Sequence, residues 1–451
     1  MNNKQTESLC PHCFRKIPAR IVPRGKKVYM EKTCPEHGSF RTILWRGEPA
    51  MNTWQRPKIP APIHYPNTEV VKGCPYDCGI CPEHRQHTCT ALLEITLDCN
   101  IRCPVCFADG GRPGGDPSLD TIESWYQTLL DSGGPYNIQL SGGEPTLRDD
   151  LPDIITRGRR LGFDFIQVNT NGIRFYEEPN FLKSSIDAGL ASLFLQFDGM
   201  TGDVYEKLRG ADYLKIKLGL IELCAEMDLG VILVPTVVPG VNDHQLGDII
   251  AFALKNMPTI RGVHFQPISY FGRFPEPPHD YKRLTLPRIM RDLAEQADEM
   301  IDLSHFRPSR CEHERCSFRA IYLVDSPDKI IPLTSEPCCC NGRSSDEGFQ
   351  SSVESIGRRW GADISPKNCK KQEKAPQEMD TQAGEAFDRF IRLYERGSFS
   401  ISAMAFQDGE NLDLERLRFC CIHVAAPDGR FVPFCAWNLT ARNGRALHRK
   451  R

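Results

Sequence analysis

The chain has 451 residues, 56 basic and 58 acidic side chains, and a formal net charge of −2. This length predicts one large domain with attachments, or two to three domains, and the balanced charge gives no reason to expect nucleic acid or an anionic membrane as a partner. Apolar runs stay far below the roughly 20 residues that span a bilayer, and the first residues do not form the apolar stretch of a signal peptide. We therefore expect a cytoplasmic protein without an integral membrane segment.

Twenty cysteines set the composition apart. In a secreted chain such a number indicates a disulfide framework. Here most of the cysteines stand in tight groups, which favours metal binding. Cys224 is an exception, because it lies in an apolar stretch of helical pattern and is expected to be a plain buried thiol.

The first cysteine group surrounds a predicted β-hairpin. Cys10-Pro-His-Cys13 precedes a strand–turn–strand segment at residues 19–30, and Cys34-Pro-Glu-His37 follows it. A tight turn in this segment brings the two ends together. The pattern resembles a rubredoxin or zinc-ribbon half-site, with either His37 or a distant cysteine as the fourth ligand. A mononuclear iron or zinc ion is equally compatible with these ligands.

Two CX3CX2C groups come next, and each is a candidate for the catalytic [4Fe–4S] cluster. They comprise Cys74, Cys78 and Cys81, and then Cys99, Cys103 and Cys106. A [4Fe–4S] cluster that only carries electrons needs four thiolates, and Cys89 follows the first group closely enough to complete such a set. The second group has no further cysteine for more than a hundred residues. We therefore expect the second group to hold a catalytic cluster with one open iron, since a zinc site would also need a fourth ligand.

From residue 91 to about residue 302 the chain alternates strand-like and helix-like segments. The predicted strands are rich in β-branched, aromatic or leucine residues: Ala91–Leu97, Tyr136–Leu140, Phe163–Val168, Leu193–Phe197, Val231–Val234 and Gly262–Pro267. The predicted helices are amphipathic: Ile122–Leu130, Leu151–Leu161, Phe181–Ala188, Val204–Met227, Leu246–Leu254 and Leu286–Ile301. This alternation predicts an α/β fold, a partial (β/α)6 TIM-like barrel with Cys-rich extensions at both ends. Cys99 directly follows the first strand, at the end where such barrels keep their chemistry.

The motifs in this region resemble a known superfamily. Cys99-Asn-Ile-Arg-Cys103-Pro-Val-Cys106-Phe107, followed after the next strand by Ser141-Gly142-Gly143-Glu144-Pro145, looks like the radical S-adenosylmethionine (SAM) superfamily. The resemblance implies that SAM chelates the open iron of a [4Fe–4S] cluster and that the Gly142–Pro145 loop binds the amine of its methionine part. Glycines let the backbone approach a ligand closely, and Glu144 is a candidate for a charge-assisted hydrogen bond to an ammonium.

Polar residues at the other strand ends are candidate SAM contacts by position alone. They are Asn169, Asn171, Gln196, Asp198, Thr236 and Gln266. Each of them is equally suited to capping a following helix or to tying down a loop.

The last third of the chain carries further candidate metal ligands. They are Cys311, Cys316, Cys338, Cys339, Cys340, Cys420, Cys421 and Cys435. Two more predicted hairpins, at residues 320–333 and 422–434, are expected to bring their end cysteines together. These residues are candidates for one or more auxiliary [4Fe–4S] clusters, although adjacent cysteines fit poorly on one iron. Between the hairpins, residues 341–390 are rich in polar residues and are expected to be a linker in which Cys369 is free.

The whole arrangement resembles the tetraether lipid synthase-like group of radical SAM enzymes, which includes a pterin methyltransferase and shorter bacterial (seleno)proteins. The resemblance implies reductive cleavage of SAM to methionine and a 5′-deoxyadenosyl radical, which abstracts hydrogen so that a substrate undergoes C–C bond formation or methylation. It also implies a small-molecule, lipid or peptide substrate and an electron donor of the ferredoxin or flavodoxin type. Two alternatives remain open: an iron–sulfur electron-transfer protein without SAM chemistry, and a zinc-ribbon binding module.

The same patterns predict how the chain is divided. We expect a metal knuckle at 1–60, an auxiliary-cluster segment at 61–90, the barrel at 91–305, a Cys-rich hairpin at 306–340, the linker at 341–390 and a C-terminal Cys-rich module at 391–451.

Overall fold

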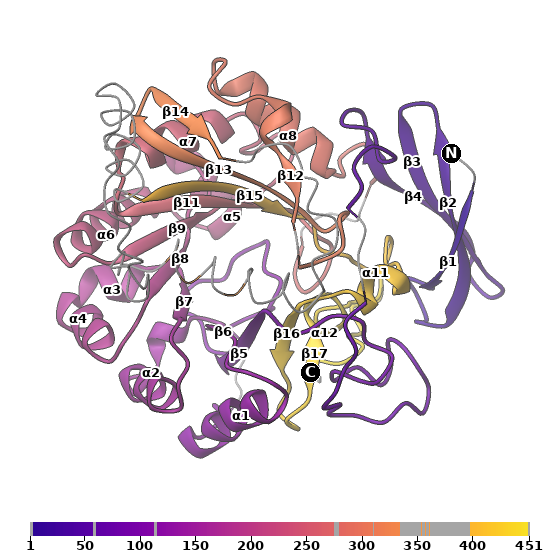
Figure 1. Ribbon diagram of the computed structural model, residues 1–451, viewed down its shortest axis with the longest axis horizontal. Coiled ribbons are helices and arrows are strands. Elements are labelled where there is room, and N and C mark those ends of the chain that lie inside the picture. The colour runs from indigo at the N-terminus through magenta and orange to yellow at the C-terminus, as the bar shows by residue number, and fades with distance from the viewer. Residues whose placement is uncertain are drawn as a thin grey trace, which may run out of the picture.

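The computed structural model describes residues 3–56, 60–111, 115–274, 279–309, 311–333 and 397–449, together with Val353, Gly357 and Trp360. Two sheets organise these residues (Figure 1). The predicted linker, Cys369 and the run Cys338–Cys340 lie outside the described residues.

The first sheet is a separate antiparallel unit at the start of the chain. Its strands pair in sequence order: β1 (Lys4–Leu9), β2 (Lys16–Arg24), β3 (Lys27–Cys34) and β4 (Gly38–Arg46). The predicted hairpin is confirmed, because β2 and β3 pair in antiparallel register around the turn at Gly25. Alternate residues of β3 face inward, which is the period-two pattern of a strand with one buried face.

The second sheet forms the partial barrel. Its strands are β5 (Thr90–Thr96), β6 (Asn137–Gly142), β7 (Ile166–Thr170), β8 (Ser192–Gln196), β9 (Gly230–Val234), β10 (Thr236–Val237), β11 (Ile260–Pro267), β12 (Arg307–Pro308), β13 (Ser317–Ser326), β14 (Lys329–Pro332), β15 (Ser398–Met404), β16 (Ile422–Ala425) and β17 (Phe431–Pro433). The order across the sheet is β12-β13-β15-β11-β9-β8-β7-β6-β5-β16-β17, with β10 on β11 and β14 on β13. The six predicted barrel strands are all present and pair in parallel.

Two strands from the C-terminal module extend this parallel array. β15 pairs in parallel with β11, and β16 pairs in parallel with β5. Within the described residues, eight neighbouring strands therefore run parallel, two more than the strand pattern predicts. The C-terminal module is thus part of the barrel sheet, whereas the expected division at residues 306 and 391 treats it as an attachment.

Helices cover the outer face of the parallel strands (Figure 1). They are α1 (Leu119–Asp131), α2 (Leu151–Arg160), α3 (Ile173–Glu177), α4 (Pro179–Asp187), α5 (Gly202–Arg209), α6 (Leu214–Glu226), α7 (Leu246–Lys255) and α8 (Leu286–Gln296), with short 3₁₀ turns at Pro145–Leu147 and Leu303–His305. Two short helices lie elsewhere: α11 (Leu414–Arg418) contacts β1 of the N-terminal sheet, and α12 (Phe434–Trp437) contacts β16 and β17. The predicted helix Val204–Met227 is two helices, because Gly210 ends α5 in the left-handed conformation at φ +92°. That conformation favours glycine and stops a helix.

Helix α1 shows how these helices form and dock. The Ser118 side chain caps its start by accepting the Thr121 amide, which satisfies one of the unpaired donors of the first turn. Residues on one stripe, including Trp125 and Leu129, are buried and join the core that contains Leu140 of β6. The apolar stripe therefore fixes which face of the helix meets the sheet.

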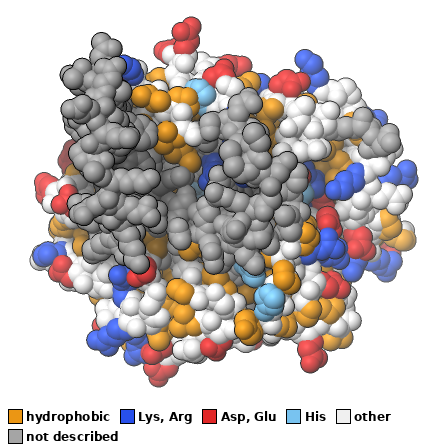
Figure 2. All heavy atoms as spheres, viewed as in Figure 1, with side chains coloured by type: hydrophobic (Ala, Val, Ile, Leu, Met, Phe, Trp, Pro, Cys, Tyr) orange, Lys and Arg blue, Asp and Glu red, His pale blue; other side chains and the backbone are white. Residues whose placement is uncertain are grey.

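The sheet does not close into a full barrel. Strands β12 and β13 lie on one side of an opening and β16 and β17 on the other (Figure 1). On the face that Figure 2 shows, basic and acidic side chains lie among one another around the rim, in keeping with the balanced charge. No helix among the described residues is long and apolar enough to cross a membrane.

Candidate active site

The loop Cys99–Cys106 begins directly after β5, at the carboxyl end of the parallel strands. Arg273, which follows β11, holds this loop in place. Its Nε donates to the Cys103 carbonyl at 2.8 Å, and its backbone exchanges two hydrogen bonds of 2.9 Å with Cys106. Arg273 has no local sequence signal of this role, because the role depends on the contact between two loops far apart in the chain.

The loop at Gly142 and Gly143 packs directly against the chain that leads into Cys99. The Gly143 and Glu144 amides donate to the carbonyls of Thr96 and Asp98 at 2.8 and 2.7 Å. A Cβ on Gly142 would stand 2.0 Å from the Thr96 carbonyl oxygen, and one on Gly143 would stand 2.0 Å from that of Asp98. The glycines are therefore required for backbone-to-backbone contact with the cysteine loop, in addition to any approach to a ligand.

Glu144 accepts four hydrogen bonds from protein groups. Its Oε1 accepts from the hydroxyls of Thr146 and Thr170, both at 2.7 Å, and from the Thr146 amide at 3.1 Å; its Oε2 accepts from the Asn171 amide at 2.7 Å. Burial raises the pKa of this carboxyl. Its acceptor sites are largely used, so Glu144 orders the loop, and Pro145 begins the short 3₁₀ turn after it.

The two asparagines after β7 differ in role. The Asn171 side chain donates to the Asn100 side chain in the cysteine loop at 2.7 Å and accepts from the Ile173 amide at 3.0 Å, so it ties a loop to the start of α3. Asn169 lines a cavity inside the barrel, and its Oδ1 is buried without a hydrogen-bond partner. Of these two, Asn169 is the residue with an acceptor left for a ligand.

Asp198 is also used within the protein. Its carboxylate forms two hydrogen bonds of 2.7 Å with Arg209 and accepts from the Thr236 amide at 3.0 Å. Arg209 in turn donates to the Thr236 hydroxyl at 3.0 Å and to the Val105 carbonyl in the cysteine loop at 3.1 Å. Asp198, a candidate SAM contact by position, forms a buried ion pair that supports the cysteine loop, and its partner Arg209 carries no local sequence signal of this role.

A cavity of about 330 Å³ lies inside the barrel and reaches the cysteine loop. Alternate residues of the strands line it, including Gln139 of β6, Gln196 of β8 and His264 and Gln266 of β11, as expected for strands whose side chains alternate between the two faces. His264 Nδ1 lies 2.8 Å from the Ser402 hydroxyl, and burial lowers its pKa to about 4. His264 is therefore neutral at physiological pH.

The three thiols of the cysteine loop all line this cavity. Burial raises the pKa of Cys99 to about 12, so the group needs a metal's positive charge to become a thiolate. The three sulfurs do not all lie within 4.8 Å of one another. In two other described groups the ligand atoms do: Cys10, Cys13, Cys34 and His37, and Cys89, Cys311 and Cys421. That wider spacing suits a cluster, in which each thiolate binds a different iron.

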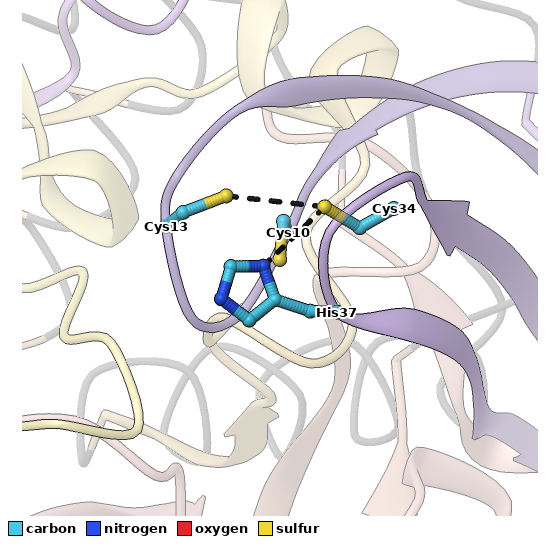
Figure 3. A group of neighbouring side chains, drawn as sticks. All are labelled: Cys10, Cys13, Cys34 and His37. Atoms are coloured by element: carbon cyan, nitrogen blue, oxygen red, sulfur yellow. Dashed lines mark hydrogen bonds between the residues drawn. The ribbon is translucent and has the colours of Figure 1, made fainter.

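The N-terminal hairpin brings four ligands together (Figure 3). The sulfurs of Cys13 and Cys34 are 3.9 Å apart, and the Cys34 sulfur is 3.5 Å from His37 Nδ1. With Cys10, all four ligand atoms lie within 4.8 Å of one another. This spacing matches a single tetrahedral ion, for which metal–sulfur bonds near 2.3 Å place sulfurs about 3.8 Å apart. His37, and not a distant cysteine, is the fourth member.

Cys89 joins a group that differs from the predicted one. Its sulfur lies within 4.8 Å of those of Cys311 and Cys421, and all three residues are buried. Cys89 therefore lies with Cys311 and Cys421, whereas the sequence pattern placed it with the first CX3CX2C motif. The reason is the parallel pairing of β5 with β16, which sets Cys89 beside Cys421, with a hydrogen bond of 2.8 Å between their backbones.

The first CX3CX2C group has a different fourth neighbour. The His84 ring, three residues after Cys81, lies 2.7 Å from the Cys420 carbonyl, which places Cys420 in this neighbourhood. The antiparallel pairing of β16 with β17 brings Cys435 back beside the segment of Cys420 and Cys421. The Arg416 Nε donates to the Cys316 sulfur at 2.9 Å. Cys224 is fully buried on α6, as expected of a plain thiol.

Comparison with known proteins identifies the family. The family model of the radical SAM superfamily matches residues 93–253, and that of the HMPTM N-terminal zinc ribbon domain matches residues 3–46. A 7,8-dihydro-6-hydroxymethylpterin dimethyltransferase of Methanocaldococcus jannaschii is 34% identical over 97% of this chain and 94% of its own length. The chain belongs to the radical SAM superfamily.

More distant relatives match the barrel region alone. A GTP 3′,8-cyclase of Tolumonas auensis is 33% identical over 37% of this chain and 49% of its own length. Among solved structures, Streptococcus suis SuiB bound to SAM aligns over 48% of this chain and 47% of its own, with 14% identity and a TM-score of 0.38. Methylornithine synthase (PylB) aligns over 48% of this chain and 64% of its own, with the same identity and TM-score.

Membership of the radical SAM superfamily decides between the functions that the sequence patterns left open. This radical SAM enzyme uses a [4Fe–4S] cluster, which supplies the electron that cleaves SAM to methionine and a 5′-deoxyadenosyl radical, and it carries auxiliary metal sites. The two alternatives, an electron-transfer protein without SAM chemistry and a zinc-ribbon binding module, do not describe the whole chain.

Proposed function

We propose that Cys99, Cys103 and Cys106 hold the cluster that binds SAM, and that the reaction takes place in the barrel cavity. The observation that carries this proposal is the shared lining: the three thiols, the Gly142–Glu144 loop and the unpartnered Oδ1 of Asn169 all border one cavity. A site with three thiolates leaves one iron of a [4Fe–4S] cluster without a protein ligand.

The surrounding residues divide into two roles in this proposal. Arg209, Arg273 and Glu144 hold the loops in position, because their polar atoms are occupied by protein groups. Asn169, Gln196 and Gln266 line the cavity and offer side-chain amides to SAM or to the substrate. Keeping the cofactors oriented and water excluded is the protein's contribution in enzymes whose cofactors supply the difficult chemistry.

The cavity supports a compact substrate. Its volume of about 330 Å³ is at the lower end of the range of roughly 300–1,000 Å³ for small-molecule sites, and in this proposal SAM and the substrate share it. The relative from Methanocaldococcus jannaschii is named as a pterin dimethyltransferase. For this chain we propose methylation or C–C bond formation on a small molecule, ahead of a lipid or a peptide. We further propose a cytoplasmic location and an electron donor of the ferredoxin or flavodoxin type.

We also propose that Cys74, Cys78, Cys81 and Cys420 hold an auxiliary [4Fe–4S] cluster. The contact between His84, three residues after Cys81, and the Cys420 carbonyl supports this grouping. Four thiolates saturate the irons, so this cluster has no position for SAM.

The experiment compares two triple variants of the anaerobically reconstituted protein. With Cys99, Cys103 and Cys106 changed to Ala, production of 5′-deoxyadenosine and the SAM-induced shift of the EPR signal of the reduced cluster should both disappear. With Cys74, Cys78 and Cys81 changed to Ala, the SAM-induced shift should remain. Cys224→Ser serves as the matched control, since this buried thiol lies on a barrel helix away from both loops. The converse pattern would assign SAM to the wrong cysteine loop.

A further inference from the structure

Three buried cysteines meet at the opening of the barrel sheet. Cys89 directly precedes β5, Cys421 directly precedes β16, and Cys311 lies in the loop between β12 and β13. The first two belong to one side of the opening and the third to the other. The Gln86 side chain donates to the Cys311 carbonyl at 2.8 Å and so holds the loop against the opposite side.

The spacing of these sulfurs distinguishes one ion from a cluster. All three lie within 4.8 Å of one another, as do the four ligands of the N-terminal hairpin. A tetrahedral ion with bonds near 2.3 Å sets sulfurs about 3.8 Å apart. A [4Fe–4S] cluster needs thiolates about 6 Å apart, because each binds a separate iron. Neither of the two described CX3CX2C groups has all three sulfurs within 4.8 Å of one another.

A carboxylate stands next to the three sulfurs. Glu312 Oε2 accepts from the Cys421 thiol at 3.8 Å, and Glu312 lines the barrel cavity. Its other oxygen accepts from the Ser317 hydroxyl, which is itself 2.7 Å from the Ser309 hydroxyl. Such an outer hydrogen bond is typical of carboxylates that ligate a metal, because it orients the remaining oxygen.

We propose that Cys89, Cys311 and Cys421 bind a single thiophilic divalent ion, zinc or iron, and that Glu312 occupies its fourth position on the side of the barrel cavity. The site is separate from the iron–sulfur clusters. The ion joins β5 and β16 to the β12–β13 loop and so fastens the opening of the sheet. The Glu312 oxygens do not lie within 4.8 Å of all three sulfurs, so Glu312 has to move slightly to bind the ion. We therefore expect its bond to exchange first, as at the open position of metal sites with three protein ligands.

The first test counts metal and inorganic sulfide per chain in the full-length protein. Cys311→Ser and Cys421→Ser should each lose one metal ion and no sulfide, whereas Cys224→Ser should lose neither. Loss of about four irons together with about four sulfides would show a cluster at this site and overturn the proposal. An unchanged metal content in both variants would overturn it as well.

The second test does not depend on whether those variants fold. Zinc is supplied to the full chain carrying Cys10→Ser and Cys13→Ser, which removes the N-terminal ion, and X-ray absorption is measured at the zinc edge. The expected result is one zinc with three sulfurs near 2.3 Å and one oxygen near 2.1 Å. Absence of bound zinc, or a shell without three sulfurs, would contradict the proposal.

The third test concerns Glu312 alone. Glu312→Gln should retain the ion but release it to a chromophoric chelator about tenfold faster or more, the size of effect expected from weakening a metal's carboxylate support. Glu314→Gln is the matched control, because Glu314 lies two residues away and faces His313. Equal release rates in the two variants would remove Glu312 from the site.

Discussion

At the scale of single residues, the buried ion pair of Arg209 and Asp198 supports the loop Cys99–Cys106. The side chains are 4% and 0% exposed, and the guanidinium also reaches the Val105 carbonyl. The pair joins α5 and the end of β8 to the loop that carries Cys103.

We predict that Arg209→Met lowers the free energy of unfolding by about 3–5 kcal/mol, because it leaves the Asp198 charge buried without a partner. The double variant Arg209→Met, Asp198→Leu should lose clearly less, since both charges are removed together. The measurement is urea unfolding followed by far-UV circular dichroism. If the double variant is as unstable as the sum of the two single variants, the residues are not coupled as described.

Gly143 controls the distance between the two loops of the site. We predict that Gly143→Ala forces the cysteine loop away, because the new Cβ would stand 2.0 Å from the Asp98 carbonyl oxygen. The variant should bind less iron at the SAM site and produce at least about tenfold less 5′-deoxyadenosine, a loss expected when reacting groups shift by an ångström. Gly115→Ala, where a Cβ meets nothing within 4 Å, is the control and should resemble wild type.

At the scale of elements, β3 connects the N-terminal sheet to the C-terminal module through a buried lysine. Lys32 Nζ donates to the Ser8 hydroxyl at 3.0 Å and to the carbonyls of Leu9 and Gly409, both at 2.8 Å. The Arg442 amide adds a hydrogen bond to the Pro11 carbonyl. The metal knuckle is therefore held against a segment nearly four hundred residues away in sequence.

We predict that Lys32→Met lowers the free energy of unfolding by about 3 kcal/mol, because three buried oxygens lose their donor and each unsatisfied group costs about 1–3 kcal/mol. Lys27→Met, at an exposed position of the same strand, should change stability little. Thermal unfolding of the two variants, measured side by side, provides the comparison. Equal midpoints would show that the lysine does not link the two modules.

The same lysine predicts a pH dependence. Burial lowers the pKa of Lys32 to about 8, whereas in the unfolded chain it is about 10.4. Between these values the unfolded chain binds more protons, so the contribution of Lys32 to stability rises with pH. We predict that wild type gains stability relative to Lys32→Met as the pH is raised from 8 to 10. A difference that is constant over this window would contradict the lowered pKa.

At the scale of the whole molecule, the C-terminal segment completes the barrel. β15 covers the edge of β11 and β16 covers the edge of β5, and the residues around them bring Cys420, Cys421 and Cys435 to the cysteine sites. Deletion of this segment would expose two buried strand edges, each a template for association with other chains.

We predict that a chain ending at residue 396 is insoluble or aggregated, whereas a chain ending at residue 449 behaves as the full protein. Size-exclusion chromatography and metal content of the soluble fraction provide the measurement. A monomeric chain ending at residue 396 with an intact SAM cluster would show that the first six barrel strands fold alone.

Much of the fold and part of the site are predictable from local patterns. The hairpin between β2 and β3 and the six barrel strands follow from periodicities and turn residues within short windows. The Cys99–Cys106 loop and the Gly142–Pro145 loop are recognisable because all their residues are adjacent in sequence. The roles of Glu144 and Asp198 were not predictable, since whether a carboxylate faces a ligand or a protein donor depends on neighbours that the fold supplies.

The grouping of the distant cysteines shows where local sequence patterns stop being informative and the tertiary structure is needed. Composition and local motifs are enough to predict that the chain is rich in metal ligands, that one loop offers three thiols, and that this loop belongs to a parallel α/β barrel. The meeting of Cys89 with Cys311 and Cys421 depends on the fold. The physical reason is that Cys89 and Cys421 are joined by the parallel pairing of β5 with β16, and such a pairing between segments more than three hundred residues apart leaves no local pattern in either.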